Sequence, residues 1–229
     1  MSKRKIGTYF KHAKRVSKKA KKSSRQLVPI NLSLARRVNN MSRKKVKLVY
    51  QTYVSLNPGA GTVADYVFRA NSPYDPDFTG AGHQPGGFDQ WMALYKFFAV
   101  ENAKITVNCY NNDTTYGQYL GITKKNVSTA ITDPTQAIEC ANTVFKILPL
   151  GAKNTDTLSL FWNSKWDVGR HSMSDQYFQG TASANPSNSY FFHVWAIDIT
   201  AAIDPSPVSA AITIEYDVTF LDPVTPAQS

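Results

Sequence analysis

The sequence predicts an all-β protein: an eight-stranded antiparallel jelly-roll sandwich that follows a disordered basic N-terminal arm. The first observation is charge, because the first 47 residues hold seventeen Lys and Arg and no acid, and the first carboxylate is Asp65. The second is the alternation of apolar and polar residues that recurs from residue 46 onward. The third is the very unequal length of the connecting segments, which favours a jelly roll over an immunoglobulin-type sandwich.

The arm, residues 1–45, mixes Lys, Arg and Ser with few large apolar side chains. Such a segment cannot bury enough apolar surface to offset its conformational entropy, so we expect disorder. It has no acids to relieve its self-repulsion and needs a polyanionic partner, for which nucleic acid is the first choice. The residues expected to bind nucleic acid are Lys3, Arg4, Lys5, Lys11, Lys14, Arg15, Lys18, Lys19, Lys21, Lys22, Arg25, Arg36, Arg37, Arg43, Lys44 and Lys45.

Three other interpretations of the arm are a ribosome-type tail, a polybasic membrane anchor and a solubility tail. An anchor would need an apolar or lipidated companion signal. Met1-Ser2 does not begin a myristoylation motif, the final Ala227-Gln228-Ser229 has no Cys, and no run of about 18 apolar residues exists to span a bilayer. We therefore expect no membrane insertion.

Two basic clusters in the arm have the pattern of a two-part nuclear import signal. They are Lys3-Arg4-Lys5 and Lys18-Lys19-Ala20-Lys21-Lys22. Any basic arm produces such matches by chance, so the pattern specifies import only weakly. Nuclear import receptors are nevertheless expected partners.

Residues 46–222 are expected to form one domain, with a tail at 223–229. About 180 residues suffice for one domain with a core and are few for two. The first strand is predicted where Val46, Leu48 and Tyr50 begin an alternation that Asn57-Pro58-Gly59 ends. The eight strands are predicted at residues 46–56, 62–70, 103–110, 115–123, 143–148, 157–164, 189–199 and 210–221.

Between the strands, the sequence predicts a long ordered loop at 71–87 and a short helix at 88–98, where large apolar residues recur at three- and four-residue spacings. Asp133-Pro134-Thr135-Gln136 begins a second short helix, with a capping carboxylate and a proline in the first turn. All twelve prolines fall outside the interiors of the predicted strands, as the loss of a backbone donor requires.

No catalytic, metal or cofactor site is predicted. The histidines make no HxH or HExxH spacing, which disfavours the enzymatic jelly rolls that hold a metal through histidine; they are His12, His83, His171 and His193. Asp75, Asp77 and Asp89 have two interpretations, a hard-cation site and turn stabilisation, and the second is favoured. Cys109 and Cys140 are interpreted as buried free thiols.

Three segments carry a resemblance to a known family. They are Phe68-Arg69-Ala70-Asn71-Ser72-Pro73-Tyr74-Asp75-Pro76-Asp77, then Gly80-Ala81-Gly82-His83-Gln84-Pro85, then Phe88-Asp89-Gln90-Trp91. Together they resemble the segment after the second strand in capsid proteins of small circular single-stranded DNA viruses that encode a replication initiator. Residues 192–196 and 214–220 resemble the last two strands of that family.

The resemblance implies a jelly roll present in sixty copies in a T=1 icosahedral shell, with the arm inside on circular single-stranded DNA. It also implies localisation to the virion, and to the host cell nucleus during assembly. The arm departs from the Arg-dominated arms of the circoviruses, because it has eleven Lys and six Arg. Lysine binds phosphate without a bidentate fork, so the arm is expected to neutralise DNA with little structure of its own.

Loops 71–91 and 168–188 are expected to supply contacts between subunits, with Phe88 and Trp91 as the candidate residues. Tyr9 and Phe10 either stack on unpaired bases or touch the inner wall of the shell. Another group of aromatic residues is expected to be mostly core, with some subunit contacts around loop 168–188; these are Trp162, Trp166, Tyr177, Phe178, Phe191 and Phe192.

Two function classes compete with the capsid. One is a cellular nucleic-acid-binding module, a β domain with a basic tail that acts as a monomer on RNA or chromatin. Such a domain should carry exposed basic and aromatic residues of its own, whereas here the residues after the first 47 are net negative, with nine basic side chains against sixteen acidic ones. The other, a β-sandwich lectin, leaves the arm without a purpose.

Overall fold

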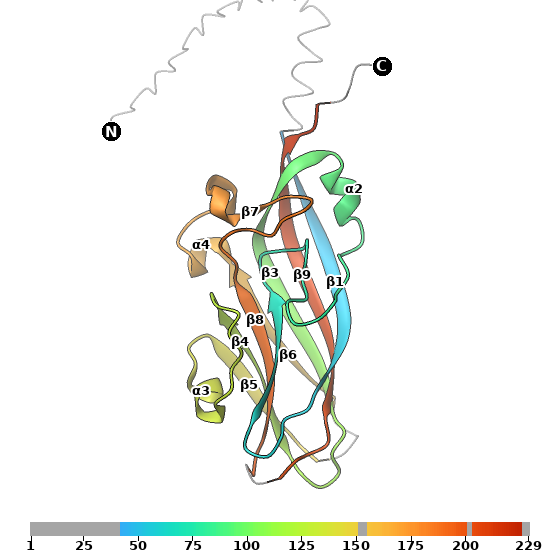
Figure 1. The fold of residues 1–229 in the computed structure, drawn as a ribbon, viewed down its shortest axis with the longest axis vertical. Coiled ribbons are helices and arrows are strands. Elements are labelled where there is room, and N and C mark those ends of the chain that lie inside the picture. The colour runs from blue at the N-terminus through green and yellow to red at the C-terminus, as the bar shows by residue number, and fades with distance from the viewer. Residues whose placement is uncertain (1–41, 151–154, 201–202, 226–229) are drawn as a thin grey trace, which may run out of the picture. The chain divides into compact units, whose positions relative to one another are not determined.

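Two antiparallel sheets face each other across a core of aromatic and branched side chains (Figure 1). The structure is a computed structural model and describes residues 42–150, 155–200 and 203–225. Its strands are β1 Arg43–Leu56, β2 Val63–Arg69, β3 Tyr95–Asn111, β4 Gln118–Lys125, β5 Thr143–Leu148, β6 Thr155–Asn163, β7 Gln179–Gly180, β8 Phe191–Asp198 and β9 Val208–Pro223. The described helices are α2 Phe88–Met92, α3 Pro134–Glu139 and α4 Ser164–Asp167, with 3-10 turns η1 Ser172–Ser174 and η2 Gln176–Phe178.

The strand order is that of a jelly roll. Sheet A has the order β1-β9-β3-β6, with β7 beside β3, and sheet B has the order β2-β8-β4-β5. The pairs β1 with β9, β2 with β8, β3 with β6 and β4 with β5 make the chain one long antiparallel ribbon, which rolls up so that its strands fall in two sheets. The predicted fold class is confirmed.

The core forms because successive side chains of each strand point to opposite faces. In β9 the inward-facing residues are nearly inaccessible to solvent; they are Ile212, Ile214, Tyr216, Val218 and Phe220. The Tyr216 hydroxyl donates a hydrogen bond of 2.7 Å to the Arg69 carbonyl at the end of β2, so it joins sheet A to sheet B. Burial raises the pKa of Tyr216 well above its usual value, which keeps the hydroxyl protonated as a donor.

The outer face of sheet B is covered by the segment between β4 and β5, residues 126–142. Ile131 and Ala137 of this segment pack on Trp195 and Ile197 of β8. The buried side chains of His193 and Asp65 also hold this segment on the sheet. His193 Nδ1 lies 2.8 Å from Asp65 Oδ2, and the same carboxylate oxygen accepts a hydrogen bond from the Ile131 N–H. On its other side, His193 Nε2 lies 2.9 Å from the Val127 carbonyl oxygen, which can only accept, so Nε2 donates.

The predicted strands all exist, and residues 143–148 match β5 end to end. Most of the others differ from the structure by two or three residues at an end. Four short elements were not predicted: α4, the 3-10 turns η1 and η2, and the two-residue β7, which makes nine strands where eight were predicted. They are held by capping side chains and tertiary pairing, which leave no periodic pattern in so few residues.

The helix predicted at residues 88–98 is wrong beyond Met92. It ends at Ala93, and the chain enters β3 at Tyr95, eight residues before the predicted strand. Pairing with β9 overrides the helical spacing, since Tyr95 lies opposite Pro223 and the ladder continues to Asn111 opposite Val208. A bulge between Val100 and Asn102 resets the register, so no single period describes the stretch.

The boundary between arm and domain also moves. Strand β1 begins at Arg43, so three residues assigned to the arm, Arg43, Lys44 and Lys45, pair with β9. At the other end, β9 continues through Pro223, the first residue of the predicted tail. The expectation of disorder for residues 1–41 lies outside the described residues.

Gly121 in β4 offers a test of the packing of sheet B. A Cβ atom built at Gly121 would lie 2.2 Å from the buried Trp195 ring, whereas one at Gly86 would meet nothing within 4 Å. We expect Gly121→Ala to lower the free energy of unfolding by about 1–3 kcal/mol through overpacking, and Gly86→Ala to change it little. Urea unfolding followed by tryptophan fluorescence measures both; equal stability of the two variants would contradict this packing.

Candidate nucleic-acid interface

The basic residues nearest the arm lie at the start of β1. Arg43, Lys45 and Lys47 point to the exposed outer face of sheet A, as the alternation of burial along the strand shows. Lys44 points the other way, and its Nζ lies 5.9 Å from the centroid of the Trp91 ring. Of the residues predicted to bind nucleic acid, only Arg43, Lys44 and Lys45 lie within the described part of the chain.

Two of the four cations are already paired with acids of the domain. Lys45 Nζ lies 2.8 Å from Glu101, in the β3 bulge, and Lys47 Nζ lies 3.2 Å from Glu215 in β9. Burial pushes the pKa of Glu101 upward, but hydrogen bonds from Lys45 and Thr219 outweigh it, so the pKa is lowered and the carboxylate stays charged. The hydrogen bond and the charge of Glu215 raise the pKa of Lys47.

Neither Arg43 nor Lys44 has a carboxylate within ion-pair distance among the described residues. They are therefore the β1 cations most available to phosphate. The other predicted nucleic-acid-binding residues lie outside the described part of the chain, and their role stays a prediction; they are Lys3, Arg4, Lys5, Lys11, Lys14, Arg15, Lys18, Lys19, Lys21, Lys22, Arg25, Arg36 and Arg37.

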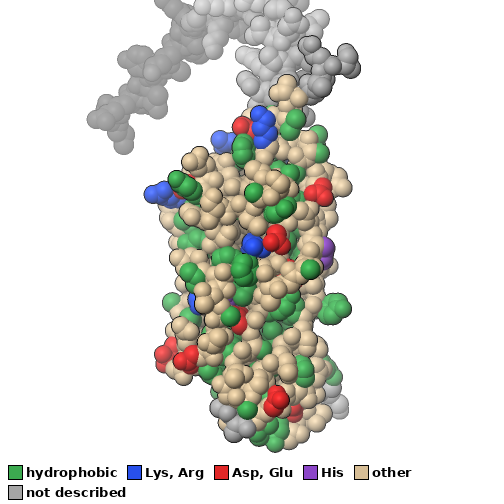
Figure 2. Space-filling view, in the orientation of Figure 1, with side chains coloured by type: hydrophobic (Ala, Val, Ile, Leu, Met, Phe, Trp, Pro, Cys, Tyr) green, Lys and Arg blue, Asp and Glu red, His purple; other side chains and the backbone are tan. Residues whose placement is uncertain are grey.

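Elsewhere in the described domain, four of the eight Lys and Arg side chains are ion-paired with acids. The further ion pairs of Lys and Arg are Arg69–Asp75, Lys124–Asp167, Lys146–Asp156 and Arg170–Asp175. On the face shown in Figure 2 the Lys and Arg side chains are few and stand close to Asp or Glu. A polyanion therefore finds no continuous basic patch on that face.

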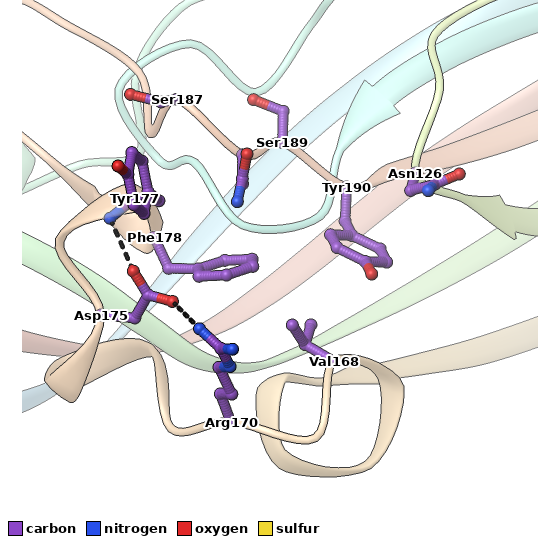
Figure 3. A pocket seen from close by; sticks show the side chains of 10 residues that line it. Asn126, Val168, Arg170, Asp175, Tyr177, Phe178, Ser187, Ser189 and Tyr190 are labelled. Carbon is purple, nitrogen blue, oxygen red and sulfur yellow. Dashed lines mark hydrogen bonds and ion pairs between the residues drawn. The ribbon is translucent and has the colours of Figure 1, made fainter.

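The long loop after β7 borders a hollow of about 550 Å³ (Figure 3). Arg170 and Asp175 pair at 3.3 Å across its mouth, and Asp175 also accepts from the Tyr177 N–H at 3.1 Å. Its other lining residues are neutral: Asn126, Val168, Tyr177, Phe178, Ser187, Asn188, Ser189 and Tyr190. With its one cation neutralised, this hollow has little attraction for phosphate.

The two candidate subunit-contact residues differ in exposure. Phe88 is 1% exposed and packs edge-on against Phe98, with ring centroids 5.3 Å apart, so in the single chain it belongs to the core. Trp91 is partly exposed and stacks on Phe220 at 5.8 Å. Of the two, Trp91 alone has surface to offer another subunit.

Carboxylates of the loop after β2 hold its turns. Asp75 pairs with Arg69, and Asp77 accepts from the Tyr66 hydroxyl at 3.0 Å and from the Gly80 N–H at 2.8 Å. Within residues 42–150, 155–200 and 203–225, no three His, Cys, Asp or Glu side chains gather in a way that would hold a metal. In that part of the chain no helix is long and apolar enough to cross a membrane.

One buried thiol and one partly buried phenol are protonated at neutral pH. Burial raises the pKa of the Cys109 thiol to about 11, so it is protonated at neutral pH. Burial and a hydrogen bond to Asp77 raise the pKa of Tyr66 to about 12. Neither group is activated for covalent chemistry.

The expectation that the late aromatic residues are mostly core is confirmed, since four of the six are buried, and the subunit contacts expected of some of them stay a prediction. Trp162, Phe178, Phe191 and Phe192 are buried, whereas Trp166 is 84% exposed and Tyr177 is 54% exposed. Sequence analysis also missed Phe161, which is 59% exposed. The alternation of β6, with Phe161 and Trp162 on opposite faces, was the one available signal.

No protein-family model matches the sequence, and no curated protein matches it significantly. Several solved structures align with the chain. That of cocksfoot mottle virus has 11% identity and a TM-score of 0.48, over 80% of this chain and 98% of that chain. That of mud crab tombus-like virus has 10% identity and a TM-score of 0.46, over 97% and 96%.

A decameric BFDV capsid protein aligns with 8% identity and a TM-score of 0.45, over 78% of this chain and 99% of that chain. With such identities and with TM-scores below 0.5, these alignments carry no argument about the function of this chain. Its fold rests on its own strand pairing.

Exposure predicts different effects of substituting the two candidate contact residues. Phe88→Ala removes a buried ring and is expected to lower the free energy of unfolding by about 3–5 kcal/mol. Trp91→Ala removes a partly exposed ring and should lower the free energy of unfolding clearly less. Because this variant should still fold, it is the one suited to assembly measurements. Thermal and urea unfolding compare the two; a Trp91→Ala loss as large as that of Phe88→Ala would show that Trp91 is equally a core residue.

Proposed function

We propose that the chain is a viral capsid protein that self-assembles into a small T=1 icosahedral shell and packages circular single-stranded DNA through its basic N-terminal arm. One observation carries the proposal: the first 47 residues hold seventeen cations and no acid, whereas the residues after them hold nine cations and sixteen acids. Several cations of the β domain are also ion-paired with its own acids. As a whole this domain attracts a polyanion weakly, so the basic arm is the part of the chain suited to hold one.

The number of cations in about sixty arms is comparable to the number of phosphates in a short single-stranded genome. With seventeen cations on each of about sixty arms, a shell brings on the order of a thousand positive charges. At one cation per phosphate, this neutralises about a thousand nucleotides. Lysine and arginine on phosphate read charge alone, so binding without strong sequence preference follows.

Self-assembly is supported by apolar side chains that the single chain leaves exposed. Phe145 and Ile147 on β5, an edge strand of sheet B, are 42% and 56% exposed, and Leu150 just beyond is 55% exposed. An apolar group at a sheet edge suits contact with another protein surface. Closed icosahedral symmetry repeats such a contact until every copy is paired.

Localisation to the virion, and to the host nucleus during assembly, belongs to the same proposal. Import would use the clusters Lys3-Arg4-Lys5 and Lys18-Lys19-Ala20-Lys21-Lys22 and host nuclear import receptors. No enzymatic role is proposed.

The first test is assembly. We expect the purified full-length protein to form closed isometric particles of uniform size without another protein, because its exposed apolar surfaces then meet copies of themselves. Negative-stain electron microscopy and light scattering measure this across salt and pH. Monomers or small oligomers under all conditions would contradict the capsid.

The second test separates packaging from folding. Deleting residues 1–40 removes thirteen of the seventeen arm cations and leaves β1 complete. We expect the truncated protein to fold and to lose most salt-sensitive binding to single-stranded DNA, with a much shallower slope of log K against log salt. Filter binding at several salt concentrations measures both proteins.

A matched control for the deletion is Lys125→Gln in the full-length chain, which removes one cation from β4 of the domain. Its affinity and salt slope should stay near those of the unaltered protein. Equal affinity and slope for the truncated and full-length proteins would place the DNA site on the β domain. That result would favour the cellular nucleic-acid-binding module instead.

A further inference from the structure

On the outer face of sheet A, two exposed aromatic rings border one hollow. Phe161, on β6, is 59% exposed, and Trp166, on α4, is 84% exposed. Both line a hollow of about 290 Å³. This is close to the lower limit of about 300 Å³ for small-molecule sites, so the hollow is of a size for a single planar ring system.

The Trp166 ring is exposed to solvent, but hydrogen bonds hold the backbone that carries it. Asn163 Oδ1 accepts from the Lys165 and Trp166 N–H groups at 2.9 and 3.0 Å. Asp167 closes the turn, because its carboxylate accepts from the Asn163 N–H at 2.8 Å and from Lys124 Nζ. A large apolar side chain presented to solvent on a fixed turn loses little entropy when it binds a partner.

The surroundings of the two rings are polar and include an available cation. Lys104 Nζ lies 5.4 Å from the centroid of the Phe161 ring and has no ion pair among the described residues. The floor carries the amide side chains of Asn102 and Asn163, which hydrogen-bond to each other. Aromatic walls over a polar floor fit a nucleobase, which has apolar faces and hydrogen-bonding edges, better than an aliphatic side chain of another subunit.

This face is also the one that continues into the basic arm. Cross-strand pairing sets Lys104 opposite Phe161 on β6 and opposite Glu215 on β9, and Glu215 is ion-paired with Lys47 of β1. Lys45 and Arg43 follow on the same face of β1 toward the arm. The basic residues at the start of β1 and the two rings therefore lie on one face of sheet A.

We propose that Phe161 and Trp166, with Lys104 beside them, form a base-stacking site for single-stranded nucleic acid on the β domain. The inference rests on the proposed packaging function and adds a second contact of a different kind. Glu215 and Asp217 also line the hollow, so it attracts phosphate little. The site takes a base, while the arm holds the phosphates.

The test compares two strands with equal phosphate charge, a 20-nucleotide oligo(dT) and an abasic strand of the same length. We expect full-length protein to bind oligo(dT) more tightly, roughly tenfold at equal salt, within the range for one or two stacked bases. Trp166→Ala should remove most of that preference and leave the salt slope unchanged, because it alters no charge. Trp166→Phe, which keeps a ring, should retain part of the preference.

Tyr53→Ala is the matched control. Tyr53 is 87% exposed on the same face of sheet A but does not border the hollow. We expect it to leave both affinities unchanged. Since Trp91 is partly exposed and Trp162 and Trp195 are buried, the fluorescence of Trp166 should dominate quenching, which oligo(dT) should cause and the abasic strand should not.

Three results would overturn the site. The first is an undiminished preference for oligo(dT) in Trp166→Ala, and the second is an equal loss of preference in Tyr53→Ala. The third is a loss of assembly in Trp166→Ala that accounts for any change in binding, which would make the ring a subunit contact. Failure of the packaging function looks different, because then neither strand would bind in a salt-dependent way.

Discussion

The pairing of β9 with both β1 and β3 is the constraint on which the rest of the structure depends. β9 lies between them in sheet A, opposite Arg43–Leu56 on one side and opposite β3 from Tyr95 to Asn111 on the other. The first strand of the domain thus completes its hydrogen bonds only with the last. Such long-range pairing gives the two sheets their fixed arrangement, and it makes the fold slow to form compared with a helical protein.

The same pairing fixes where the arm leaves the domain. Because β1 starts at Arg43 opposite Leu221, the arm begins beside the C-terminal end of β9, at the end of sheet A that also carries the Lys45–Glu101 and Lys47–Glu215 pairs. The domain therefore uses its acids to neutralise its own lysines near the junction. Under the proposed function, phosphate would be bound by the arm.

The two faces of sheet A differ in composition, because one packs in the core and the other is exposed to solvent. Its inner face is a closed apolar core, while its outer face carries amides, ion pairs and two aromatic rings that the core does not need. The positions of Phe161 and Trp166, on a strand and on a capped turn, suit contact with a partner.

The sequence alone determined the all-β class, the eight principal strands and the division of charge. The alternation of apolar and polar residues and the distribution of charge can both be read directly from the sequence, without knowledge of the packing. The sequence could not place the start of β3. Apolar residues at 88–98 have helical spacing, but from Tyr95 onward the chain pairs with β9 instead, and only the tertiary structure shows that pairing. Nor could it separate Trp162 from Trp166. Both are large and apolar, and which one enters the core depends on the face of β6 and on the turn that α4 makes after it, held by side chains from other strands.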